Sequence, residues 1–88
     1  MPASDRTTAS WQLDCRDMPA PYPLLGARAA LSMMREGDVL GLLVTDRDSI
    51  ADVPAWCRMT GHRLIVAEER HGIHCVLIRK GDVSCRNR

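Results

Sequence analysis

The sequence contains few aromatic side chains and no excess of one charge. Its 88 residues include no phenylalanine, one tyrosine and two tryptophans, and 12 lysines and arginines stand against 11 aspartates and glutamates. Proteins that bind single-stranded nucleic acids combine positively charged grooves with aromatic rings on which the bases stack. Because both features are scarce, we expect no direct nucleic-acid partner.

Long apolar runs and closely spaced cysteine pairs are also missing. No run approaches the roughly 20 apolar residues that a membrane-spanning helix needs, and residues 1–10 lack the pattern of a signal peptide. We expect a cytoplasmic protein with no membrane partner, in which Cys15, Cys57, Cys75 and Cys85 are reduced thiols. Their spacing contains no C-x-x-C pair, so we predict neither a metal site nor a cofactor.

The length of the chain fits one domain between two tails. Residues 1–9 and 81–88 are polar and lack hydrophobic periodicity, which predicts flexible ends around a domain of residues 10–80. Within the domain, residues 11–15 alternate apolar and polar side chains as a strand does. Residues 22–36 repeat apolar side chains at helical spacing, and the apolar run 39–44 predicts a central strand.

The second half of the domain predicts a shorter helix and a hairpin. We expect the helix to be capped by Asp52, to carry Pro54 in its first turn and to end at Gly61. Two strand-like runs, 63–69 and 73–79, follow. The order β-α-β-α-β-β favours an α/β fold of the α+β two-layer type, a four-stranded mixed sheet with two helices on one face.

The clearest motif lies between the first strand and the first helix. Three closely spaced prolines end the strand, because proline cannot donate to a sheet ladder, and the last suits the first turn of a helix. The whole segment reads Leu13-Asp14-Cys15-Arg16-Asp17-Met18-Pro19-Ala20-Pro21-Tyr22-Pro23.

This segment resembles the TusA (SirA-like) family of sulfur-carrier proteins, in which Leu-Asp is followed by Gly-Leu and then by Cys-Pro-x-Pro. Leu13, Asp14, Pro21 and Pro23 match the family pattern, and Met18 replaces its leucine. The resemblance covers about residues 11–80. The further matching pieces are Gly37-Asp38, Asp46, residues 52–57 before Gly61-His62, and residues 77–80.

The resemblance implies a function in sulfur relay. Family members accept sulfane sulfur on the motif cysteine from a cysteine desulfurase, a rhodanese or a DsrE-like protein, and pass it on. A cysteine in the first turn of a helix favours the thiolate, because the helix dipole and free amides stabilise negative charge. Here Ala20 stands at that position, and its methyl group cannot accept sulfur. Asp17 replaces the family's glycine and would disfavour a nearby thiolate by charge repulsion.

Other cysteines and histidines offer weaker alternatives. Cys15, next to Arg16, is a candidate substitute carrier, whereas Cys57 and Cys75 lie in apolar patterns typical of the core. Cys85 lies in the C-terminal tail without a shaped site. A metal site built from His62, His74 and Cys75 is disfavoured, because adjacent residues of a strand point to opposite faces.

Two functions remain open from the sequence. In the first, the chain binds sulfur-transfer proteins without carrying sulfur, through a surface formed by Asp14, Arg16, Asp17, Pro21, Tyr22 and Pro23. In the alternative, it is a genuine sulfur carrier or sulfurtransferase in which Ala20 is an engineered replacement or Cys15 takes over. The second departure at Asp17 favours natural divergence. Neither the partner nor the oligomeric state follows from the sequence.

Overall fold

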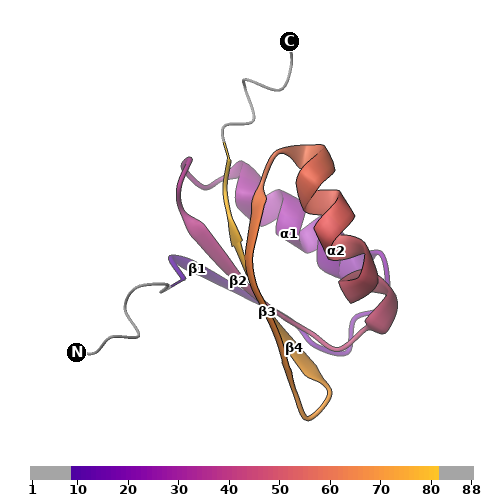
Figure 1. The fold of residues 1–88 in the computed structure, drawn as a ribbon. Helices are drawn as coiled ribbons and strands as arrows, with labels where there is room; N and C mark the ends of the chain where they lie inside the picture. The colour runs from indigo at the N-terminus through magenta and orange to yellow at the C-terminus, as the bar shows by residue number, and fades with distance from the viewer. Residues whose placement is uncertain (1–8, 82–88) are drawn as a thin grey trace, which may run out of the picture.

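The fold is a two-layer α+β sandwich, seen in a computed structural model that describes residues 9–81. The elements follow the predicted order β-α-β-α-β-β (Figure 1). Their bounds are β1 Trp11–Cys15, α1 Tyr22–Ser32, β2 Val39–Val44, α2 Arg47–Thr60, β3 Arg63–Arg70 and β4 Ile73–Arg79. The predicted tails lie outside the described residues, except Ala9 and Gly81.

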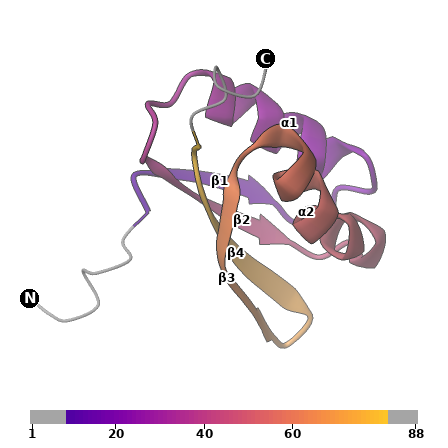
Figure 2. The same ribbon diagram turned by 45° about the horizontal axis from the view of Figure 1, so that its top comes forward.

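The four strands form one mixed sheet in the order β1-β2-β4-β3. β1 pairs with β2 in parallel, because α1 carries the chain back between them, and β4 is antiparallel to both β2 and β3. Both helices cover the same face of the sheet, and the other face is left open by the described elements (Figures 1 and 2). The predicted architecture is therefore confirmed.

The core lies between the helices and the sheet. Alternate residues of β2 point into it, because side chains of a strand alternate between faces, and Leu40 and Leu42 are at most 1% exposed. Leu31 of α1, Cys57 of α2 and Ile78 of β4 complete the centre. The helical spacing of apolar residues predicted for this segment is matched in α1, where Ala27 and Leu31 are buried.

Two helix boundaries differ from the prediction. α1 ends at Ser32 and not at residue 36, and Gly37, with φ of 92°, lies in the following turn, where its N–H donates to the Lys80 carbonyl. α2 begins at Arg47, so residues 47–51 are helical and not a connecting turn. The predicted cap was wrong because Asp46, and not Asp52, accepts the hydrogen bond from the Ser49 amide at 2.9 Å.

The start of α2 explains why Pro54 lies inside the helix and not in its first turn. Asp46 also accepts a hydrogen bond from the buried Ser49 hydroxyl at 2.9 Å, which satisfies a polar group that would be costly to bury unpaired. Pro54 is exposed on the outer side of the helix. Gly61 ends α2 in the left-handed region with φ of 86°, as predicted.

Candidate functional site

The motif segment forms the loop from Arg16 to Pro21, between the carboxyl end of β1 and the start of α1. β2 ends beside it, since Cys15 is paired with Val44 in the parallel ladder. All six loop residues are exposed. The carboxyl ends of parallel strands are a common place for binding sites in α/β proteins, so the loop lies where a site is expected.

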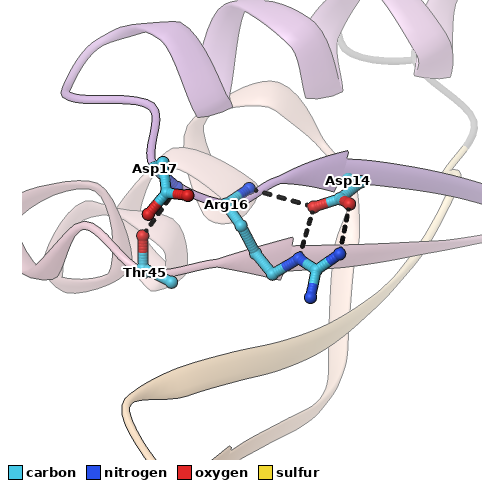
Figure 3. Close-up of polar contacts among 4 residues, drawn as sticks. All are labelled: Asp14, Arg16, Asp17 and Thr45. Carbon is cyan, nitrogen blue, oxygen red and sulfur yellow. Dashed lines mark hydrogen bonds and ion pairs between the residues drawn. The ribbon is translucent and has the colours of Figure 1, made fainter.

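An ion pair closes one side of this loop. The Arg16 guanidinium donates to the Asp14 carboxylate twice, Nε to Oδ1 at 2.9 Å and Nη2 to Oδ2 at 2.7 Å (Figure 3). The Arg16 amide also donates to Asp14 Oδ1 at 3.1 Å. These bonds lower the pKa of Asp14 to about 2. Both side chains are exposed, so the pair shapes the surface more than it stabilises the fold.

Asp17 anchors the loop to the neighbouring strand end. Its backbone N–H donates to the Thr45 hydroxyl at 2.8 Å, directly after β2 (Figure 3). Its φ of 66° lies in the left-handed region, which glycine adopts freely and which aspartate tolerates better than most residues. The glycine that the resemblance implies at this position would adopt this conformation freely, and aspartate places a carboxylate there at the surface.

Ala20 lies exposed at the entrance to α1. Its peptide bond to Pro21 is cis. Pro23 is buried and fixes the start of the helix against the core, while Tyr22 is 57% exposed. The structure therefore places the methyl group of Ala20 at the surface where the resemblance puts a reactive sulfur.

The backbone amides beside Ala20 differ from the expectation of free donors. The Tyr22 N–H donates to the Pro19 carbonyl at 3.0 Å, and the N–H groups of Leu24 and Leu25 both donate to the Pro21 carbonyl at 3.1 Å. Pro23 has no N–H. The first turn of α1 thus satisfies its own donors, which leaves the helix dipole as its main attraction for an anion at position 20.

Exposed apolar side chains lie on both sides of Ala20 along the chain. Met18 is 41% exposed, and Leu25, one turn after Tyr22, is 50% exposed. Tyr22 and Leu25 are three residues apart and share one side of α1. Large exposed apolar groups near one site are typical of a protein-binding surface. Sequence reasoning missed Leu25, although its helical spacing from Tyr22 was a usable signal.

The described cysteines lie away from this surface. Cys15 is 2% exposed on the face of β1 that meets α1, and burial together with the nearby Asp14 carboxylate raises the pKa of its thiol. Cys57 is equally buried, and burial raises its pKa to about 11. Cys75 is half-buried on the open face of the sheet. Cys85 lies outside the described residues.

The described residues give no support to a metal site, a membrane-spanning helix or a functional histidine. Residues 9–81 contain no group of three histidine, cysteine or acidic side chains arranged to hold a metal ion. Within the same residues, neither helix is long and apolar enough to cross a membrane. His62 is 6.0 Å from Trp56, ring to ring, and its Nδ1 accepts the Gly81 N–H at 3.2 Å, which is a structural role.

A family model and two relatives match most of this chain. Residues 12–80 match the family model described as sulfurtransferase TusA. A "Putative sulfur carrier protein" of Neisseria meningitidis serogroup A is 40% identical over 67 residues, which cover 76% of this chain and 90% of that protein. The sulfur carrier protein TusA of Allochromatium vinosum is 35% identical over 69 residues, 78% of this chain and 91% of that protein.

A solved structure has the same fold. The SirA-like protein of Desulfitobacterium hafniense superposes with a TM-score of 0.71 at 23% identity, over 82% of this chain and 99% of that protein. At this identity the likeness supports the fold alone. It agrees with the four-stranded mixed sheet and two helices described above.

Proposed function

Since the chain belongs to the TusA family of sulfur carriers, we propose that it binds sulfur-transfer proteins through the surface around Ala20 without carrying persulfide there. The observation that carries the proposal is an exposed alanine in an intact proline frame at the start of α1. Persulfide formation needs a thiolate as the nucleophile. The methyl group of Ala20 therefore preserves the surface for docking but cannot form a persulfide.

The contact surface is defined as Asp14, Arg16, Asp17, Met18, Ala20, Pro21, Tyr22 and Leu25; Pro23, which the sequence pattern included, is buried and supports the start of α1 from the core side. It combines one exposed ring and two exposed apolar side chains with an exposed bidentate ion pair. Tyrosine and arginine are common anchors of protein interfaces, and the hydrogen bond from the Asp17 N–H to the Thr45 hydroxyl ties the loop to the end of β2. A loop held in this way loses little entropy on binding.

The partners proposed are those of the family, a cysteine desulfurase, a rhodanese or a DsrE-like protein. A chain that occupies their docking site without accepting sulfur would compete with a functional carrier. We therefore propose a regulatory role in the sulfur relay.

The alternative is a carrier that uses Cys15. Its thiol is buried under α1 and its pKa is raised, so a thiolate at Cys15 is neither accessible nor favoured. Attack on a donor's persulfide from this position would require β1 or α1 to move. The alternative in which Ala20 is an engineered replacement requires that the natural gene encode cysteine at position 20, and an alanine codon there contradicts it.

The deciding experiment is intact-mass spectrometry after incubation with a cysteine desulfurase and free cysteine, with Ala20→Cys and Ala20→Ser run beside the wild-type chain. One added sulfur raises the mass by about 32 Da, and the persulfide form is reversed by reductant. We expect the gain only in Ala20→Cys. A reductant-sensitive gain in the wild-type chain, mapped to any cysteine, would contradict the proposal.

Binding is tested separately by calorimetry with the same desulfurase, with a rhodanese and with a DsrE-like protein. Tyr22→Ala should weaken binding by about tenfold or more, because exposed aromatic anchors contribute strongly to interfaces. Met59→Ala is the matched control, since Met59 is an exposed apolar residue of α2, 77% exposed, outside the contact surface. Equal effects of the two substitutions, or no wild-type binding to any of the three partner classes, would count against a docking role.

A further inference from the structure

The face of the sheet opposite the helices is apolar at its centre. A hollow of about 430 Å³ lies there. The residues that line it on this face are Ala9, Gln12, Asp14, Gly41, Leu43, Cys75 and Leu77. Leu43, Cys75 and Leu77 are only half-buried, and no described helix or strand covers them (Figure 2). Exposed apolar surface in one patch is characteristic of an interface.

The strand register places charges symmetrically about Leu77. Residues directly opposite each other on neighbouring strands share a face, and Leu77 pairs with Gly41 and Val66. Arg79 lies two positions after Leu77 in β4 and pairs with Arg63 of β3. Cys75 lies two positions before Leu77 in β4 and pairs with Glu68 of β3. Gly41, Leu77 and Val66 form a row of paired residues across the sheet. On this face Arg63 and Glu68 therefore lie equally far from that row, on opposite sides of it.

These charges have no partner within the described chain. Arg63 and Glu68 are exposed, and neither forms an ion pair among residues 9–81. Both lie on β3, an edge strand. Charged side chains at the rim of an apolar patch are available to select and orient a partner.

The charge pattern matches a second copy of the same face. Two identical faces pack against each other about a two-fold axis, so each residue must suit its symmetric counterpart. An axis along the strands would place β3 over β1 and Glu68 over the acidic Asp14. An axis across the strands, through the row of Leu77, places Arg63 over the partner's Glu68 on both sides. Only the second arrangement pairs opposite charges.

We propose that two copies of this chain associate through their open sheet faces about the axis across the strands. Leu77 lies at the centre, in contact with the partner's Leu77. Arg63 pairs with the partner's Glu68, and the two-fold axis repeats this pair on the other side of Leu77. Sheets packed face to face are about 10 Å apart, a spacing that apolar side chains from both faces fill. The association is centred on Leu77 and does not include Ala20 or Tyr22, whereas Asp14, which lines the hollow, belongs to both this face and the contact surface.

Sedimentation velocity of the full chain over about a hundredfold range of concentration tests the proposal, because dimer formation depends on protomer concentration. A face of four short strands is small, which predicts a weak, reversible dimer. We expect the dimer fraction to rise with concentration. A monomer throughout the range, as would follow if another segment or protein covers this face, overturns the proposal.

Charge reversal tests the geometry. Arg63→Glu and Glu68→Arg should each weaken association by about tenfold or more, since each brings like charges together twice. The double variant R63E/E68R should recover wild-type association. Arg47→Glu, on the exposed start of α2, is the control and should change nothing. If the single variants weaken association and the double variant does not recover it, the proposed axis is wrong. Circular dichroism is the control that each variant is folded.

Discussion

Asp17 shows how one residue adjusts the backbone and the charge of the site together. Its left-handed φ of 66° is the conformation for which the family's glycine is suited. Asp17→Ala places a β-carbon there without the polar side chain that makes the region tolerable, so it should be less stable than Asp17→Gly by about 1 kcal/mol. Urea unfolding measures the difference, and Asp17→Asn should stay near the wild-type chain.

The cysteines predict a second residue-scale outcome. Cys15 and Cys57 are each 2% exposed, and burial raises the pKa of both thiols, that of Cys57 to about 11. Cys75 is half-buried on the open sheet face. Alkylation of the native protein at neutral pH, followed by peptide mapping, should therefore modify Cys75 before Cys15 or Cys57.

Cys85, outside the described residues, is followed as a separate peptide in that experiment. Alkylation in denaturant provides the control, because all buried thiols become accessible there. Fast modification of Cys15 in the native protein would reopen its role as a carrier, since the argument against that role depends on its burial.

At the scale of elements, the start of α2 determines where the second helix packs. The Asp46 carboxylate accepts from both the amide and the hydroxyl of Ser49, each at 2.9 Å. Asp46→Ala should lower the free energy of unfolding by about 1 to 2 kcal/mol, because it removes an N-cap and leaves the buried Ser49 hydroxyl without its acceptor. Thermal or urea unfolding checks this value.

Asp52→Ala is the matched control for the cap. Asp52 is the residue that the sequence pattern favoured as the cap, but it is exposed inside the helix. Alanine is the better helix former at such a position, so this variant should be at least as stable as the wild-type chain. A loss at position 52 as large as that at position 46 would contradict the observed helix start.

At the scale of the whole molecule, His62 joins the start of β3 to the chain after β4. Its Nδ1 accepts the Gly81 N–H, and burial, with the nearby Lys80 charge, lowers the pKa of His62 from 6.5. The folded state therefore binds fewer protons than the unfolded state between the lowered pKa and 6.5. Stability is fully present above pH 6.5 and falls as the pH drops through this window.

Urea unfolding at a series of pH values from about 7.5 to 5.5 measures this loss, in a range where unperturbed carboxylates stay ionised. His62→Gln retains a side-chain acceptor without a titrating group, so its stability should depend less on pH across the same range. The same dependence in both proteins would assign the titration to another group.

The residue pattern alone was sufficient for the order of the elements and for the absence of a nucleophile at position 20. Apolar periodicity changes from strand to helix spacing whatever the tertiary contacts are, and the left-handed Gly61 ends α2 as the pattern predicted. The chemistry of Ala20 follows from its side chain, because a methyl group is not a nucleophile in any fold. These features are local, and a sequence displays local features directly.

Only the tertiary structure decided which groups meet. Asp17 and Thr45 are 28 residues apart and join because two parallel strands end side by side. Cys15 is buried and Cys75 is half-exposed because α1 covers one face of the sheet and no described element covers the other. Burial and pairing of this kind depend on which helices and strands contact each other in the folded protein. The periodicity of side chains within one helix or strand does not show which other element packs against it.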